Sequence, residues 1–197
     1  MARPAGQGEV TKKKIVEVAI ALFEAKGYSA TSMSDLKERT TFSKGTIYYH
    51  FQNKEELFLH CVKEASSQWM AKCLLECKDA QTATEKLEIV AKCYTEDLQK
   101  PITKMISEFL VVSNSLLAEQ QIRATVQAEQ DIFKNILIEG IQNGEFRATL
   151  AIEHTAILFY GMLTGLEITD VLGYSKQQFH VLREEAVQLF LVAIKNT

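Results

Sequence analysis

Apolar positions recur with helical spacing from residue 11 to the C-terminus of the chain. In the first such segment, five apolar residues between Ile15 and Phe23 fall at i, i+3, i+4, i+7 and i+8, which predicts one buried helical stripe. Gly27 predicts the end of this helix, because glycine readily takes the positive φ of a helix C-cap. The preceding residues 1–10 are rich in Gly, Ala and Pro, and we expect them to form a flexible arm.

Two short helices and one long helix are predicted next. Ser32, with Asp35 three residues later, has the arrangement of a capping box and opens a helix that ends near Thr40. Ser43 caps a third, very short helix, and Asn53 opens a long fourth helix.

Helical periodicity persists through the remainder of the chain, with no strand alternation and no repeat. The scarcity of helix breakers, with two prolines and nine glycines in 197 residues, also favours long helices. The sequence therefore predicts an all-α protein in which a three-helix N-terminal head is followed by a larger helical body. The helices expected in the body cover 84–98, 101–118, 122–143, 151–171 and 176–195.

The net charge of −3 is unevenly divided along the chain. Residues 1–54 carry nine Lys and Arg against five Asp and Glu, a balance of +4, whereas residues 55–197 carry a balance of −7. A basic head on an acidic body indicates that only the head meets a polyanion such as DNA. We therefore expect a DNA-binding domain over 1–54 and a separate helical body over 55–197.

The composition argues against a secreted or membrane protein. The N-terminus lacks the order of basic, apolar and small residues that marks a signal peptide. The densest apolar run, 156–166, falls short of the ~18 residues of a membrane span. We expect a cytoplasmic protein with no membrane contact and no cofactor.

The four cysteines follow no zinc-finger or CxxC spacing. Buried, reduced thiols are the expected state of Cys61, Cys73, Cys77 and Cys93, since free cysteine packs as a small hydrophobe. A thiol redox switch or a metal site is the alternative.

The second and third predicted helices form a helix-turn-helix unit, which places its second helix in the DNA major groove. At ~100° per residue, Ile47 and Phe51 form the buried edge of that helix. The opposite face is centred on Gly45 and Tyr49, with Thr46 beside them, and this face is the expected reading surface.

Groups that can bind phosphate surround this surface. Tyr48 and His50 lie on its two shoulders, and Lys44 and Lys54 stand at the starts of two helices. Free N–H groups at helix N-termini also bind anions. Taken singly, a shoulder tyrosine fits core packing and the lysines fit solvated charges. The lysines at 12–14 fit either phosphate contact or a solvated arm.

The stretch FEAKGYSATSMSDLKERTTFSKGTIYYHFQNKEEL resembles the DNA-binding head of the TetR family of bacterial repressors. The resemblance spans about residues 11–58. It is carried by the helix starts, by the Ser-Lys-Gly at 43–45 and by the Tyr-Tyr-His-Phe at 48–51. The resemblance implies a two-fold dimer in which each head reads half of a palindromic operator. The residues it implies as DNA contacts are Ser32, Lys44, Thr46, Tyr48, Tyr49, His50 and Lys54.

One departure concerns the turn of the helix-turn-helix unit. Many family members have Ala-Gly-Val there, whereas this chain has Thr40, Thr41 and Phe42. Threonine takes a left-handed conformation at much higher cost than glycine, so we expect a different type of turn.

The resemblance also implies that the body senses a ligand and forms the dimer. Helix 151–171 is apolar almost all round, which indicates burial on every side. Together with the last helix it predicts a four-helix dimer interface, with plain monomer core as the alternative. The interface residues expected are Leu158, Gly161, Gly165, Leu182, Leu189 and Phe190.

Polar residues on apolar helices are the candidates for a ligand cavity. A buried carboxylate needs a partner, so Glu108 and Glu167 must be exposed, paired or ready to receive a cation. The segment ILIEGIQNGEF resembles multidrug-sensing members of the family, which bind bulky cationic aromatic compounds. Structural aromatics and solvated carboxylates are the alternative. The ligand contacts expected are Trp69, Met105, Glu108, Phe109, Val112, Phe133, Tyr160 and Glu167.

These observations predict a ligand-responsive transcriptional repressor that binds double-stranded operator DNA as a homodimer and is released by a small-molecule inducer, hydrophobic or cationic. An enzyme is disfavoured, since the sequence has no catalytic Ser/His/Asp array, phosphate-binding Gly loop or metal-ligand spacing. The competing interpretations are a helical adaptor that docks on an acidic protein, an activator, and a regulator that responds to a protein or to thiol oxidation.

Overall fold

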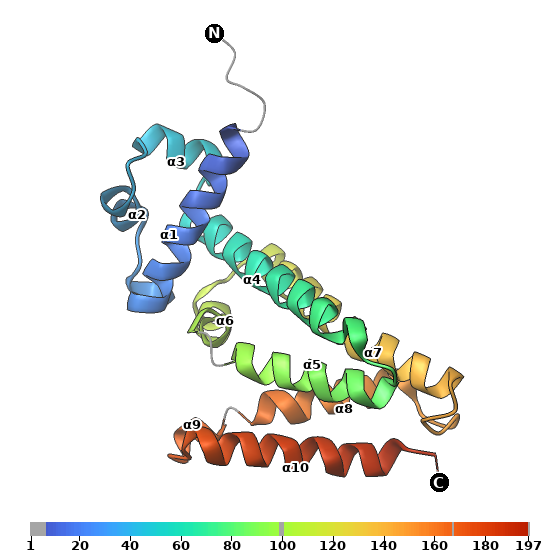
Figure 1. The fold of residues 1–197 in the computed structure, drawn as a ribbon. Helices are drawn as coiled ribbons and strands as arrows, with labels where there is room; N and C mark the ends of the chain where they lie inside the picture. Colours follow the sequence, from blue (N-terminus) through green and yellow to red (C-terminus); the bar gives the residue numbers. More distant parts are fainter. Residues whose placement is uncertain (1–6, 99–100, 167, 197) are drawn as a thin grey trace. The chain divides into compact units, whose positions relative to one another are not determined.

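The computed structural model describes residues 7–98, 101–166 and 168–196, without the side chains of 97, 98, 101–104 and 170. The described residues form helices joined by short links, with one isolated β-bridge, between Phe146 and Lys195. The all-α prediction is therefore confirmed (Figure 1). The elements are α1 (Gln7–Ala30), α2 (Met33–Arg39), α3 (Lys44–His50), α4 (Lys54–Glu76), the 3-10 turn η1 (Cys77–Asp79), α5 (Ala83–Leu98), α6 (Pro101–Val112), α7 (Leu116–Gln142), α8 (Ile152–Gly165), α9 (Ile168–Val171) and α10 (Lys176–Ile194).

The N-terminal arm is shorter than predicted. Residues 7–10, expected to be flexible, form the first turn of α1, where the Thr11 hydroxyl donates to the Gln7 carbonyl at 2.9 Å. Residues 1–6 lie outside the described residues. Gly27 interrupts the helix as predicted, with a φ of 81° and a ψ of 168°.

Two helix boundaries in the body were predicted in the wrong place. The expected helix 101–118 ends at Val112, and α7 begins at Leu116. The link between them, residues 113–115, consists of Ser, Asn and Ser, and Ser115 caps α7 by accepting from the Ala118 N–H at 3.2 Å. The expected single helix 151–171 is divided, since α8 ends at Gly165 and α9 begins at Ile168.

The chain forms two compact units, each of two segments. The head unit contains the described residues up to Ala65 together with Pro101–Arg123, and the body unit contains Ser66 to Leu98 and Ala124 to Asn196. α4 and α7 each contribute to both units. The head unit thus includes the predicted DNA-binding segment 1–54 and adds the first half of α4, α6 and the start of α7; the functional boundary at residue 54 stays a prediction.

Four aromatic rings hold the head unit together. Tyr28 of α1 contacts Phe58 of α4 and Phe109 of α6, with ring centroids 4.8 and 4.9 Å apart, and Phe23 of α1 lies 5.2 Å from Phe58. Buried aromatic pairs of this kind each add about 0.5–1.5 kcal/mol beyond the burial of their area. α6 is therefore part of the core that supports the N-terminal helices.

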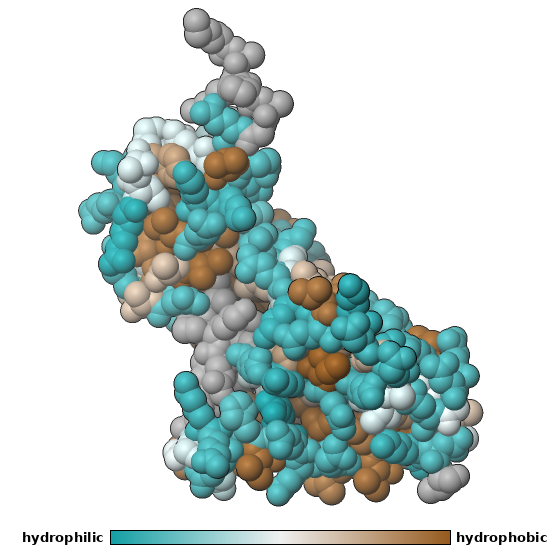
Figure 2. Space-filling view, viewed as in Figure 1, coloured by the Kyte–Doolittle hydropathy of each residue, from teal (hydrophilic) through white to brown (hydrophobic). Residues whose placement is uncertain are grey.

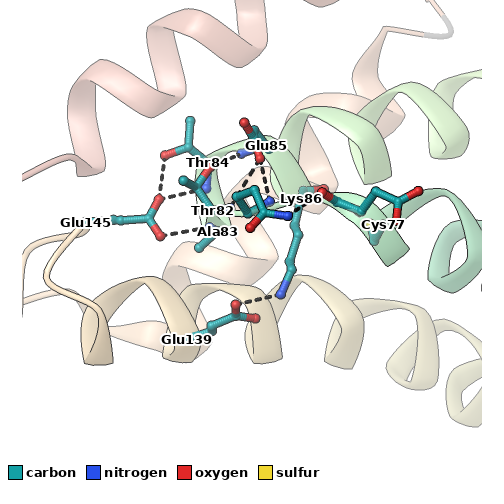
Figure 3. Close-up of polar contacts among 10 residues, drawn as sticks. Cys77, Thr82, Ala83, Thr84, Glu85, Lys86, Glu139 and Glu145 are labelled. Atoms are coloured by element: carbon teal, nitrogen blue, oxygen red, sulfur yellow. Dashed lines mark hydrogen bonds and ion pairs between the residues drawn. The ribbon is translucent and has the colours of Figure 1, made fainter.

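The start of α5 is fixed in the body unit by Glu145, which follows α7. Its carboxylate accepts from the N–H groups of Ala83 at 2.8 Å and Thr84 at 3.0 Å (Figure 3). A carboxylate at this position satisfies N–H groups that have no partner within the helix. Lys86 extends the link by an ion pair of 2.6 Å with Glu139 of α7.

The environment of the four cysteines disfavours their thiolate form. Burial raises the pKa of Cys61 to about 12 and that of Cys93 to about 11, and it also raises the pKa values of Cys73 and Cys77. Within the described part of the chain, no group of three His, Cys, Asp or Glu side chains could hold a metal ion.

We expect Cys61 to react with iodoacetamide at pH 8 at least roughly a hundredfold more slowly in the folded protein than in urea, because only the thiolate is nucleophilic. Mass spectrometry of timed samples measures this rate. Cys77, which is half-buried, should be labelled first. Rapid labelling of Cys61 in the folded protein would instead support a thiol switch.

Candidate nucleic-acid interface and ligand site

The helix-turn-helix unit begins with the predicted capping box. Ser32 Oγ accepts from the Asp35 N–H at 3.1 Å, and the Asp35 carboxylate accepts from the Ser32 N–H at 2.8 Å. At the start of α3, Ser43 Oγ accepts from the Thr46 N–H at 3.1 Å. These side chains set the first turn of each helix without help from the body.

The turn between α2 and α3 avoids left-handed backbone. Thr40 is extended, with a φ of −117° and a ψ of 159°, and no described residue other than glycine has a positive φ. The turn thus avoids the conformation that threonine takes only at high cost; its difference from a glycine-containing turn stays a prediction.

The faces of α3 are divided as the sequence predicted. Ile47 and Phe51 are buried, whereas Tyr49 is 80% exposed and Tyr48 41% exposed. The ammonium of Lys44 lies 5.6 Å from the centre of the Tyr48 ring. Gly45 is exposed, and a Cβ there would have its nearest neighbour, Ser43 Oγ, at 3.8 Å, so the backbone is open to close approach.

His50 and Lys54 have more constrained positions. The His50 ring contacts Tyr49 at 5.2 Å, and its Nε2 is buried with no hydrogen-bond partner. Lys54 donates from Nζ to the carbonyls of Tyr28 at 3.0 Å and Ser29 at 3.3 Å. In the structure the Lys54 ammonium therefore holds the end of α1; its predicted contact with DNA phosphate is untested.

Three of the predicted ligand contacts meet in the body unit. Trp69, Phe133 and Tyr160 all contact Tyr94, with ring centroids 5.6, 6.0 and 4.9 Å away. We call these four residues the aromatic cluster. Tyr94 was not predicted from the sequence, although its helical spacing from Leu87 and Val90 indicates a buried face.

Polar groups enter the aromatic cluster from α7 and α8. The Tyr160 hydroxyl donates to Glu129 Oε2 at 3.1 Å, and the hydroxyls of Tyr94 and Thr164 lie 2.9 Å apart. Burial raises the pKa of Tyr160, and neighbouring Tyr94 and Glu129 raise it further, so its hydroxyl keeps its proton. The indole N–H of Trp69 is buried with no hydrogen-bond partner. The cluster thus combines flat aromatic faces with a carboxylate.

Comparison with known proteins covers both parts of the chain. Residues 15–61 match the family model described as "Bacterial regulatory proteins, tetR family", and residues 65–196 match that of the "QacR-like protein, C-terminal region". The chain belongs to the TetR family. Among the members similar to it is the HTH-type transcriptional regulator QacR of Staphylococcus aureus, which is 31% identical over 68% of this chain and 73% of its own.

Other TetR-type relatives match over nearly the whole length. The fatty acid metabolism regulator protein of Bacillus subtilis is 24% identical over 93% of this chain and 95% of its own. The crystal structure of FadR from Bacillus subtilis with stearoyl-CoA has a TM-score of 0.78, at 24% identity, and covers 91% and 97% of the two chains. That of a regulator from Saccharomonospora viridis with choline has a TM-score of 0.79, at 16% identity, over 96% and 100%.

Membership of the TetR family fixes the class of function. The protein is a ligand-responsive repressor that binds operator DNA as a homodimer. None of its described helices is both long enough and apolar enough to cross a lipid bilayer.

The remaining ligand contacts predicted for this TetR-family chain lie in the head unit or outside the described residues, and their role stays a prediction. Met105, Glu108 and Phe109 belong to the head unit, where Met105 and Phe109 are core residues, and Val112 is half exposed. Glu167 lies outside the described residues. A surface hollow of about 380 Å³ in the head unit is lined by different residues, namely Leu110, Ser113, Asn114, Ser115, Leu116 and Glu119.

The predicted dimer surface is open in the single chain. Leu158 of α8 is 68% exposed and Leu189 of α10 is 73% exposed, and nothing lies within 4 Å of a Cβ placed at Gly161 or Gly165. Hydrophobic side chains also reach the surface among hydrophilic ones on the face drawn in Figure 2. Leu182 is half-buried, and Phe190 packs on Phe159 with ring centroids 4.3 Å apart.

Proposed function

We propose that α3 of this repressor reads the operator through Tyr49, flanked by groups that bind the DNA backbone. The observation that carries the proposal is the exposure of Tyr49 on the face of α3 opposite the buried Ile47 and Phe51, since no fold requirement accounts for an aromatic ring there. The residues proposed to contact DNA are Ser32, Lys44, Gly45, Thr46, Tyr48, Tyr49, His50 and Lys54.

We propose further that the aromatic cluster is the inducer site and that it takes a hydrophobic cation. Aromatic faces attract cations through their quadrupoles, and a nearby carboxylate adds charge complementarity. Glu129, in hydrogen-bond contact with Tyr160, supplies that carboxylate.

The proposed coupling of the two sites uses α4, which runs without a break from Lys54 to Glu76 and carries Trp69. An inducer that displaces α4 changes the separation of the two recognition helices. Operator binding needs these helices about one DNA turn apart, ~34 Å, so a few ångströms of spread releases the dimer. We place this action in the cytoplasm, where the chromosome lies, and assign no catalysis to the protein.

Glu129→Gln should weaken binding of tetraphenylphosphonium, a hydrophobic cation, about 5- to 30-fold, since it removes the charge that pairs with the ligand. Fluorescence titration measures this, because Trp69 is the sole tryptophan of the chain and belongs to the cluster.

Two comparisons make the charge argument specific. Asp131→Asn removes a charge from the same helix and should leave binding unchanged. Neutral triphenylphosphine oxide should bind the wild-type protein and Glu129→Gln equally well. An equal loss of affinity for the cation and the neutral compound would contradict the assignment of Glu129.

We propose that the dimer forms through α8 and α10. The residues assigned to the interface are Leu158, Gly161, Gly165, Leu182, Leu189 and Phe190. Their support is the exposure of large apolar side chains next to glycines that leave room for a second helix.

A further inference from the structure

Glu108, a predicted contact for a cationic ligand, has its carboxylate already engaged by α1. It accepts from the Ser29 N–H at 3.0 Å, from the Ser29 hydroxyl at 2.6 Å and from the Tyr28 N–H at 3.4 Å. These hydrogen bonds, first those of Ser29, lower the pKa of Glu108, so the carboxylate is charged at neutral pH. The three donors belong to the residues that directly follow the break at Gly27.

Lys54 binds the carbonyl groups of the same two residues, Tyr28 and Ser29. Its ammonium donates to the carbonyls of Tyr28 and Ser29 and lies 4.3 Å from the centre of the Tyr28 ring. The turn after Gly27 is thus held by two side chains: the Glu108 carboxylate of α6 accepts from its N–H groups, and the Lys54 ammonium of α4 donates to its carbonyls. We call it the clamped turn. Hydrogen bonds to charged groups are about twice as strong as neutral ones and set direction as well as distance.

The clamped turn leads directly into the helix-turn-helix unit. Two residues after Ser29 the buried Thr31 hydroxyl donates to the Gly27 carbonyl at 2.7 Å, and Ser32 then caps α2. Few residues separate the turn from α2. The direction in which the chain leaves α1 therefore restricts where α2 starts and, through it, the position of α3.

α6 has further contacts that the carboxylate complements. Phe109 packs against Tyr28 and Phe58, and directly after α6 the Ser113 hydroxyl donates to Glu55 of α4 at 3.0 Å. Ring packing holds α6 close to α1 but is weakly directional. The hydrogen bonds of Glu108 add a directional contact between the turn and α6.

We propose that Glu108 is a positioning residue for operator binding, through which α6 fixes the turn after α1 and thereby the orientation of the helix-turn-helix pair. It touches no DNA itself. The inference rests on the DNA-binding function of the family and is independent of the aromatic cluster.

The test compares Glu108→Gln, Ser29→Ala, their double variant and Glu119→Gln in the full-length dimer, with an operator duplex selected from random sequences. Glu119→Gln is the matched control, since it removes another head-unit carboxylate, one that pairs with Arg123. We expect Glu108→Gln to weaken operator binding roughly 3- to 10-fold, as for one hydrogen bond to a charged group at a partly exposed site. The double variant should resemble Glu108→Gln alone, because both substitutions break one contact.

Two readouts separate positioning from direct DNA contact and from a purely structural role. The dependence of operator affinity on salt should keep its slope in Glu108→Gln, since no phosphate contact is lost. Amide hydrogen exchange should accelerate at Tyr28 and Ser29 while the thermal midpoint of the dimer changes by no more than in Glu119→Gln.

Three results for Glu108→Gln would each overturn the inference. They are wild-type affinity for the operator, a reduced salt slope, and a loss of affinity matched by a loss of thermal stability. Failure of the wild-type protein to select any duplex would count against the proposed function instead. The two failures are therefore distinguishable, and neither depends on an inducer.

Discussion

Leu189→Glu is expected to dissociate the dimer into monomers and to reduce operator affinity at least roughly a hundredfold. The leucine is 73% exposed in the single chain, so the charge costs little within the monomer. In the proposed interface it would be buried against a second copy of the chain, and an unpaired buried charge costs about 3–5 kcal/mol. Sedimentation velocity measures the oligomeric state, and fluorescence anisotropy measures operator binding.

Val111→Glu is the matched control for this substitution. Val111 is also a highly exposed apolar residue, but it belongs to α6 of the head unit. It should leave the dimer intact. A dimeric Leu189→Glu protein would place the interface on another surface, and Leu158→Glu then tests whether α8 takes part at all.

Tyr49→Ala is expected to weaken operator binding by about 1–3 kcal/mol, as does loss of a base or phosphate contact in other DNA-binding proteins. Because the ring is 80% exposed, the free energy of unfolding should hardly change. Electrophoretic mobility shift at fixed salt, together with thermal unfolding, measures both quantities.

Tyr49→Phe divides this effect into two parts. If the hydroxyl donates to DNA, the phenylalanine variant should lose most of the affinity; if the ring packs on a base or sugar, it should retain it. Leu75→Ala, at an exposed position of α4 in the body unit, serves as the control. Unchanged affinity in Tyr49→Ala would remove the residue from the reading surface.

Local chemistry explains why the head was predictable. The capping side chains Ser32, Asp35 and Ser43 bond to amides within three residues, so short stretches of sequence carry the information. The division of α3 into a buried and an exposed face likewise follows from helical periodicity alone.

The links between helices were less predictable, because serine fits both helix interior and cap. At residues 113–115 the apolar periodicity passes across the break, and Ser115 bonds to the Ala118 amide in place of a helix interior contact. The sequence pattern alone does not distinguish the two uses.

Long-range partners were beyond sequence reasoning. Glu108 is separated from Ser29 by 79 residues, and Glu129 from Tyr160 by 31. An acid on an apolar helix indicates that some partner exists, but its identity depends on packing among several helices. For this reason the sequence pattern assigns Glu108 to a ligand, whereas the structure pairs it with the end of α1.

The head unit is discontinuous along the chain, and this restricts how the regulator can be recombined with other proteins. Residues 1–54 alone leave Phe23 and Tyr28 without the rings of Phe58 and Phe109, and leave the turn after Gly27 without its carboxylate. A chimera that joins this operator specificity to a foreign sensor must therefore carry α6 and the first half of α4 as well. The unit that must be transferred to keep the operator specificity is therefore compact in space but discontinuous in sequence.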